Sequence, residues 1–404
     1  MADESTTINS TAVLSLIQSL QSQLKNSSQG PDDEAGDDEA TKTVCVLWDL
    51  AASQELAEFI ESVGLALILA AIVSEHKTRP PRLVEVSLGA LANLAAWDSV
   101  RQEMAQSSSV VRAPFLTLMS NSDSQCLREA CRMLHAVTTG VTAATANPWR
   151  EDLCDEPVLN QLLCFLINSL DESLLLQVCQ LMHAAAFGSE SVTRLLTRLH
   201  GGPIIAEVFI QQAGSEGELR DALLNLLYFP SWPPGFLTEV VERDEGNRFQ
   251  WALQTMLVEA VAEGSEDISF VRIALEILGN VEELRSSQQQ GDDEVALGAP
   301  VLCTAVRLLL VQDAEDEGDQ EAVKLTKAAW RLLTAAKEAV STWDVVVCLC
   351  ANASTVLKAG QRHTTACEAV VRRVLLTEGG APRDAGLLPQ GGGLGVLAGY
   401  LVAL

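Results

Sequence analysis

Two Cys–His pairs form the clearest metal-ligand pattern in this chain. Cys131 and His135 lie four residues apart, and Cys179 and His183 repeat that spacing 48 residues further on. Two thiolates and two imidazoles make up one of the common tetrahedral zinc sites, with metal–ligand bonds of about 2.0 to 2.3 Å. These side chains could hold zinc only if the fold brought all four to one point.

The segments that carry these pairs are copies of one eleven-residue pattern. Clear copies cover residues 84–94, 127–137, 175–185 and 271–281, with looser copies at 219–229 and 323–333. The first, fourth, eighth and eleventh positions are mostly apolar or small, which places one buried stripe on a helix face. The copies begin about 43 to 52 residues apart, the spacing typical of HEAT or armadillo units. The sequence therefore predicts an all-α protein, an armadillo/HEAT-like right-handed helical solenoid.

Stacking of such repeats argues against a zinc site. Neighbouring repeats are related roughly by translation, so equivalent side chains point the same way about 10 Å apart and do not converge. Another copy carries Leu88 and Ala92 at the same two positions, which indicates packing sites. We therefore expect neither a metal nor a cofactor here, and we interpret the pairs as buried thiols and imidazoles.

Other catalytic patterns are weaker. No histidine lies in a recognisable signature for nucleophilic catalysis. The glycine run at 391–395 lacks the Lys-Ser/Thr that follows a phosphate loop. Paired carboxylates occur only in charged runs, where solvation is the ordinary role. We expect a protein that is not an enzyme.

Charge bounds the partners. The formal net charge is −27, and the acids are concentrated in runs near residues 32–39 and 313–321. Such a surface repels phosphate backbones and anionic membranes, so we expect a protein partner with basic segments, no direct nucleic acid and no membrane. The ten cysteines contain no CxxC pair and the first residues carry no signal peptide, which indicates a reducing compartment.

Composition divides the chain into three parts. Residues 1–43 are predicted to be a mostly flexible acidic arm with one short helical candidate, because their Ser, Gly and acid content buries little apolar surface. Residues 44–378 are predicted to be the repeat solenoid, with polar insertions near 284–297 and 312–321. Residues 379–404 form a Gly-rich tail.

Two asparagines are candidate partner-binding residues. Asn93 and Asn280 hold the tenth position of their copies, beside the buried stripe. In armadillo proteins such as the importin-α adaptors, a similarly placed Asn grips the main chain of an extended peptide, and a Trp four residues earlier holds side chains. This chain has Gly89 and Glu276 at those earlier positions. For both asparagines we favour a hydrogen bond to a neighbouring repeat over peptide capture.

The N-terminal repeats resemble a known family. The matching features cluster between residues 40 and 140 and follow a similar acidic arm: Cys45, Trp48, Asp49, Phe59, the Pro81-Arg82-Leu83 sequence, Glu85, Gly89 and Asn93. They are similar to the serum amyloid A-like protein 1 family, also called synoviocyte proliferation-associated proteins. The resemblance implies an armadillo-type protein of the nucleus that promotes cell proliferation, with no known catalytic activity, cofactor or ligand residues.

Three functions remain open. The leading hypothesis is a non-enzymatic scaffold or adaptor that presents a concave face to a protein partner. An armadillo-type chaperone or transport adaptor, binding extended basic or apolar segments, is the alternative, and a groove lined by Leu and Met would favour the chaperone. An enzyme would need a pocket with a strongly shifted Cys or His. The residues alone do not choose between nucleus and cytoplasm, nor give the oligomeric state.

Overall fold

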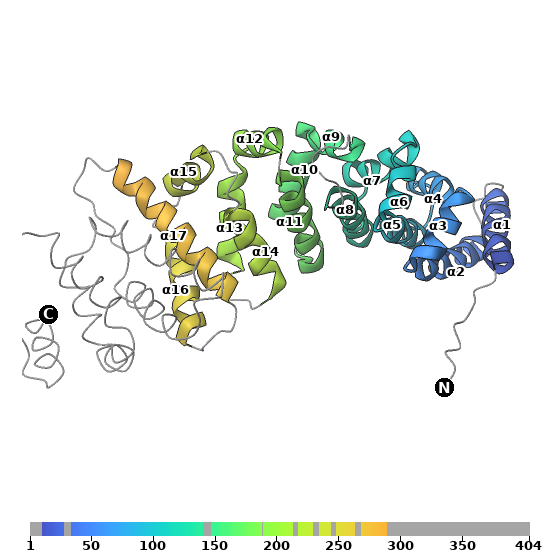
Figure 1. Ribbon diagram of the computed structural model, residues 1–404, viewed down its shortest axis with the longest axis horizontal. Helices are drawn as coiled ribbons and strands as arrows, with labels where there is room; N and C mark the ends of the chain where they lie inside the picture. The colour runs from blue at the N-terminus through green and yellow to red at the C-terminus, as the bar shows by residue number, and fades with distance from the viewer. Residues whose placement is uncertain are drawn as a thin grey trace, which may run out of the picture. The chain divides into compact units, whose positions relative to one another are not determined.

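The chain is helical throughout the part that the structure describes. The computed structural model describes residues 10–27, 34–139, 147–187, 189–212, 217–228, 234–243, 248–262 and 268–288. Every regular element in these ranges is an α-helix, as Figure 1 shows, which confirms the all-α prediction. The chain splits into two compact units, one of Met1–Val208 with Gly217–Pro233 and the other of Phe209–Glu216 with Pro234–Leu404.

The first unit is built from three-helix repeats. Each repeat has a short first helix, a longer second helix and a third helix that carries the eleven-residue pattern. The first helices are α3 (Gln54–Ser62), α6 (Asp98–Met104), α9 (Pro148–Leu153) and α12 (Glu190–Arg198). The second helices are α4 (Leu65–Ser74), α7 (Ser108–Ser120), α10 (Glu156–Asn168) and α13 (Gly201–Gln211). The third helices are α5 (Pro81–Ala95), α8 (Ser124–Thr139), α11 (Glu172–Ala186) and α14 (Glu218–Tyr228).

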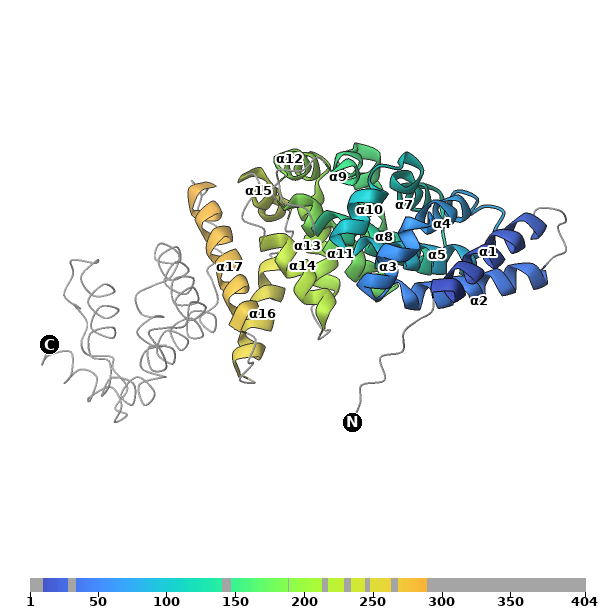
Figure 2. The same ribbon diagram turned by 45° about the vertical axis from the view of Figure 1, so that its right-hand side comes forward.

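The third helices stack in a row, which we call the third-helix ladder. It begins with α2 (Glu34–Leu50) and continues through α5, α8, α11 and α14, each packed on the next (Figures 1 and 2). The second helices α4, α7 and α10 form a parallel row of their own. Two rows of stacked helices with short first helices between repeats are the armadillo arrangement, so the first unit is an armadillo-type solenoid.

Helix α5 shows why the ladder is stable. Proline occupies its first position, Pro81, where a missing N–H costs nothing. Every residue from Leu83 to Ala92 is buried, because α2 and α8 flank the helix and α4 covers its core face. Leu88 is fully buried there, and replacing such a side chain with Ala typically costs about 2 to 5 kcal/mol.

The N-terminal segment differs from the predicted flexible arm. Residues 10–27 form the helix α1 (Ser10–Ser27), which packs against α2 through Val13, Ile17 and Leu20. These residues recur every three or four positions, so they give α1 an apolar stripe that α2 can bury. The opposite side of α1 is polar and exposed, including Ser15 and Gln18. The helical candidate predicted in this segment, residues 12–24, lies within α1, whereas its packing against α2 was not predicted.

The second unit contains α15 (Pro234–Arg243), α16 (Arg248–Ala262) and α17 (Ile268–Gln288), with α17 packed on both others. Phe209 and Phe249 meet edge to face, with ring centroids 5.8 Å apart. Helix α17 continues to Gln288, so the first part of the predicted insertion at 284–297 is helical. The copy at 323–333, the insertion near 312–321 and the tail at 379–404 lie outside the described residues.

The helices were compared with the length and hydropathy that a membrane span needs. Of the helices described above, none alone is long and apolar enough to cross a membrane. Two bent pairs, α3 with α4 and α5 with α6, pass that test together by length and composition.

Candidate functional site on the third-helix ladder

The ladder holds Trp48 against Gly89. Trp48 lies on α2 and Gly89 at the middle of α5. A Cβ atom built on Gly89 would come within 2.8 Å of Cε2 and Cζ2 of the indole. Only a residue without a side chain fits beneath this ring, so Gly89 is required by close approach rather than by backbone conformation. A Trp from the neighbouring repeat therefore covers the position where a peptide-binding armadillo protein would carry its own Trp.

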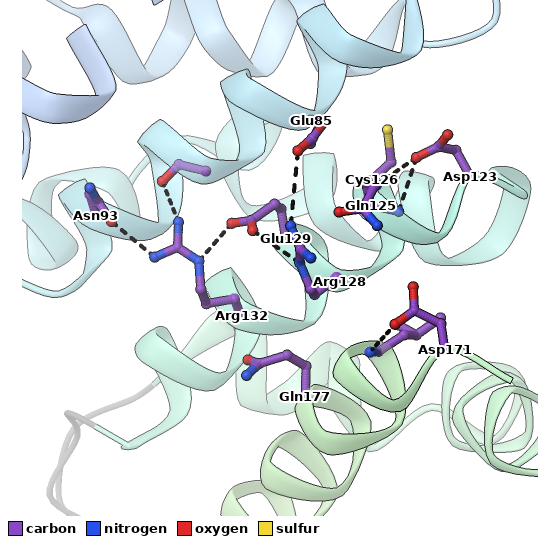
Figure 3. A network of polar contacts seen from close by, with 12 residues as sticks. Glu85, Asn93, Asp123, Gln125, Cys126, Arg128, Glu129, Arg132, Asp171 and Gln177 are labelled. Atoms are coloured by element: carbon purple, nitrogen blue, oxygen red, sulfur yellow. Dashed lines mark hydrogen bonds and ion pairs between the residues drawn. The ribbon is translucent and has the colours of Figure 1, made fainter. Parts of the chain in front are cut away.

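Asn93 joins three consecutive helices of the ladder. Its Nδ2 donates to the carbonyl oxygen of Trp48 at 3.1 Å. Its Oδ1 accepts from Nη1 of Arg132 at 2.9 Å, as Figure 3 shows. The amide is half-buried, so both bonds are partly shielded from water. Asn93 thus makes the inter-repeat hydrogen bond that we favoured over peptide capture.

Arg132 is the centre of this network. Its Nε donates to Oε2 of Glu129 at 2.6 Å, and its Nη2 donates to the carbonyl oxygen of Gly89 at 2.9 Å. The guanidinium carbon also lies 5.7 Å from the ring centroid of Trp48, within the range of a cation–π contact. One arginine of α8 therefore fixes the side chains and main chain of α5 and α2, which rigidifies the ladder at this point.

A second charge cluster lies one turn away. Glu85 of α5 is 7% exposed and accepts a hydrogen bond from Nη1 of Arg82 at 2.6 Å. Arg128 of α8 lies between Glu85 and Glu129: its Nη2 is 3.9 Å from Glu85, and its Nε is 3.4 Å from Glu129. Figure 3 shows both clusters along α5 and α8. The carboxylates are buried while the guanidinium groups reach the surface, with 59% of the Arg82 side chain exposed.

Two nearby aspartates are committed to helix N-termini. Asp123 accepts hydrogen bonds from the backbone N–H groups of Gln125 and Cys126 at 3.0 Å each. Asp171 caps α11 by accepting from the N–H of Leu174 at 3.1 Å. Burial would raise the pKa of Asp171, but this bond, others from the same region and the charge of Arg128 outweigh it and lower the pKa. Both carboxylates therefore already have hydrogen-bond partners at helix N-termini.

The Cys–His pairs lie on α8 and α11 without forming a metal cluster. Cys131 and Cys179 are fully buried, and burial raises the pKa of Cys179 to about 12, which disfavours the thiolate that zinc needs. Burial also lowers the pKa of His135 and His183, and the charge of His183 lowers that of His135 further. Within the described ranges, no group of three or more His, Cys, Asp or Glu side chains could hold a metal ion.

The other predicted residues lie apart from this network. Asn280 is half-buried on α17 in the second unit, where Arg272 Nη1 donates to Glu276 Oε1 at 3.1 Å. Asp49 follows Trp48 on α2 and is exposed. Partner binding by Asn93 and Asn280 stays a prediction.

Sequence reasoning did not identify the arginines of this network as functional residues. Of the three, only Arg82 was named, as part of the Pro81-Arg82-Leu83 sequence that resembles the family. Arg128 and Arg132 were not predicted. A usable signal was present at the sixth position of the copies, where Gly89 is replaced by Arg132 in the next repeat. Glycine in one copy and a long cationic side chain at the same position of the next copy indicate that the arginine side chain of one helix can reach the backbone of the neighbouring helix.

Three-helix repeats that stack through their third helices define an armadillo-type helical-repeat protein. Comparisons with known proteins carry this further. No protein-family model matches the chain. The curated Protein saal1 of Danio rerio is 29% identical over 142 residues, that of Xenopus tropicalis 28% over 146, and Protein SAAL1 of Homo sapiens 25% over 149. The resemblance to the serum amyloid A-like protein 1 family is therefore confirmed over about a third of the chain.

These matches are partial on both sides. They cover 35 or 36% of this chain, and the chain spans only 29 or 30% of the length of these relatives. Among solved structures, engineered helical proteins are similar to this chain. One engineered protein is 14% identical with a TM-score of 0.47, covering 68% of this chain and 97% of its own. A designed armadillo repeat protein is 13% identical with a TM-score of 0.43, covering 79% of this chain and 99% of its own.

Proposed function

We propose that the chain is a non-enzymatic scaffold that holds a protein partner on its third-helix ladder. The observation that carries this proposal is the run of partly exposed polar side chains along consecutive third helices, fixed by bonds between repeats. Asn93 and Arg132 preorganise this surface, so a partner does not have to order it on binding. Repeat solenoids commonly use such extended faces for macromolecular partners.

The composition of the ladder favours an adaptor over a chaperone. Its half-buried polar residues include Gln125, Gln177 and Gln180, which suit hydrogen bonds to an ordered segment. Of the large exposed apolar side chains, Val46 lies on α2 of the ladder, whereas Leu67, Leu116, Met119 and Ile167 lie on the second helices. A chaperone surface for non-native apolar segments would be expected to gather such side chains in one groove.

Three further features belong to the proposal. The resemblance to the serum amyloid A-like protein 1 family supports a nuclear protein that promotes cell proliferation.

The net charge of −27 supports partners with basic segments for the acidic surfaces of the chain. Burial of Cys131 and Cys179, which raises the pKa of both thiols, supports a role without covalent catalysis. Imaging of the tagged full chain in animal cells tests the location, and cytoplasmic signal alone would exclude a nuclear role.

Site-specific crosslinking tests the scaffold. A photoreactive amino acid is placed at Gln125 or Gln177 on the ladder, and at Gln102, an exposed residue of α6, as the matched control. We expect irradiation in living cells to give the same crosslinked protein from both ladder positions and none from Gln102. The purified partner should then bind the purified chain. Identical products from all three positions, or none from the ladder, would refute the proposal.

A further inference from the structure

Arg128 has the longest ion pairs of the three arginines in this cluster, at 3.4 Å from Glu129 and 3.9 Å from Glu85. Glu85 is held by Arg82 at 2.6 Å and Glu129 by Arg132 at 2.6 Å. Asp171 accepts a hydrogen bond at the N-terminus of α11, and its charge also interacts with that of Arg128. Each acid near Arg128 therefore has a nearer hydrogen-bond donor. Arg82, Arg128 and Arg132 carry three positive charges, and Glu85, Glu129 and Asp171 can carry three negative ones, so the guanidinium of Arg128 itself is what the site offers to an anion.

The guanidinium of Arg128 also retains its hydrogen-bonding capacity. Its contacts with Glu129 and Glu85, at 3.4 and 3.9 Å, are ion pairs. Among the residues that the structure describes, none forms a hydrogen bond with its guanidinium. Its side chain is 28% exposed, so part of it is accessible to a partner. An arginine has five N–H donors in a planar fork that matches the two oxygens of a carboxylate.

The surroundings match an extended peptide. Gln125 lies one turn before Arg128 on α8, and Gln177 lies on the adjoining α11, as Figure 3 shows. Both are half-buried amides that can bond to a peptide main chain. Arg82 offers a second, more exposed guanidinium at the α5 side of the cluster. The polar groups thus follow the ladder from α5 to α11.

We propose that Arg128, with Arg82 beside it, binds carboxylate side chains of an acidic, extended segment of a partner protein. The inference rests on the proposed scaffold function and names the partner chemistry for this part of the ladder. A basic side chain would meet two guanidinium groups here. A phosphate, with about −1.5 to −2 charges at pH 7, is both attracted by the arginines and repelled by Glu85 and Glu129 more strongly than a carboxylate, so the test below includes a phosphoserine peptide.

Local charge outweighs the charge of the whole chain at short range. The net charge of −27 opposes an acidic partner at a distance, but the Debye length at physiological ionic strength is only about 8 Å. A bound carboxylate within hydrogen-bonding distance of Arg128 therefore experiences mainly this cluster. Basic segments remain the expected partners of other, acidic surfaces.

Peptide titration of the full chain tests this inference. The probe is a fluorescein-labelled peptide of alternating Glu and Ser, roughly twelve residues long. About six extended residues at about 3.3 Å each span the roughly 20 Å from α5 to α11, and the remaining residues extend beyond both ends. Peptides with Gln, Lys or phosphoserine in place of Glu are compared. Binding is followed by fluorescence anisotropy at an ionic strength of about 0.15 M.

Two variants distinguish the contribution of Arg128 to binding from the effect of the overall charge. Arg128→Gln leaves the Arg82–Glu85 and Arg132–Glu129 bonds in place, so the fold should survive. Arg194→Gln removes the same charge from an exposed ion pair with Glu190 on α12 and is the matched control. We expect the Glu peptide to bind more tightly than the Gln and Lys peptides, with about a tenfold loss in Arg128→Gln and less than about twofold in Arg194→Gln.

Other outcomes overturn the inference. Equal binding of the Glu and Gln peptides would remove the role of the carboxylate. Equal losses in the two variants would reduce the effect to overall charge. Tighter, Arg128-dependent binding of the phosphoserine peptide would assign the site to phosphate. In each case a partner crosslinked through Gln125 and Gln177 would still support the scaffold, so the two proposals fail separately.

Discussion

The indole of Trp48 rests on the bare backbone of Gly89, one repeat further along the chain. This contact explains why the middle of α5 carries a residue that helices otherwise disfavour, by about 1 kcal/mol relative to Ala. The energy lost in local helix preference is offset by close packing between α2 and α5. The packing of α2 on α5 can therefore be tested by adding a single methyl group at Gly89.

Gly89→Ala should destabilise the protein. The added Cβ would sit 2.8 Å from the indole, and overpacking of this kind costs about 1 to 3 kcal/mol. Urea denaturation of the full chain, followed by circular dichroism, measures the change. In a Trp48→Ala background the same substitution should be neutral or stabilising, because the ring is gone and Ala favours the helix. Equal costs in both backgrounds would contradict the contact.

Arg132→Met should loosen the first three helices of the ladder. It removes three hydrogen bonds and leaves Glu129, which is 4% exposed, without its closest cation. Because Arg132 is itself one-third exposed, the cost should lie near the lower end for a broken buried pair, about 2 to 3 kcal/mol. Hydrogen exchange should rise in α5 and α8, and unchanged protection there would exclude the bridging role. Glu129→Gln in the same chain should recover part of the loss.

Glu61 should make stability fall as pH rises toward neutrality. Burial raises its pKa from 4.5 to about 7, against the bond from the N–H of Ala66 and with a contribution from the charge of Glu103. A folded-state pKa above the unfolded value means that its stabilising contribution is full below about pH 4.5 and is lost as pH rises through 7. Glu61→Gln should flatten the curve of unfolding free energy in that window.

Glu58→Gln is the matched control on the same helix. The hydrogen bond from Ser99 lowers the pKa of Glu58, so this group finishes titrating below the window in which Glu61 acts. Its substitution should leave the slope between about pH 5 and pH 7 unchanged. A slope that disappears in both variants, or in neither, would assign it to other groups.

The two ladder histidines should act in the opposite direction. The pKa of His135 and of His183 is lowered, chiefly by burial, from an ordinary value of 6.5. A depressed folded-state pKa means that the protein loses stability as pH falls below 6.5, because both imidazoles must become charged in a desolvated place. The double variant His135→Gln, His183→Gln should be less sensitive to acid between about pH 6.5 and pH 5, measured by thermal unfolding. Greater acid sensitivity in the double variant would refute this assignment.

Much of the ladder could be predicted from the sequence, whereas its contacts could not. The copies at 84–94, 127–137 and 175–185 fall within α5, α8 and α11, because an apolar stripe at helical spacing reports which face is buried. A stripe does not report which neighbour lies across it. That Trp48 covers Gly89, and that Arg132 reaches Asn93, depends on the rotation of adjacent helices. The helical candidate at residues 12–24 lies within α1, but its packing on α2 was not predicted, because its three buried residues stand among Ser and Gln.

Helix α1 also decides where the stack ends. An uncovered α2 would offer its apolar side to the next available surface, and the simplest such surface is the equivalent side of another molecule. Val13, Ile17 and Leu20 occupy that side from within the same chain, and Ser15 and Gln18 face water on the other. The apolar side of α2 that α1 covers is therefore not available to another molecule while α1 stays in place.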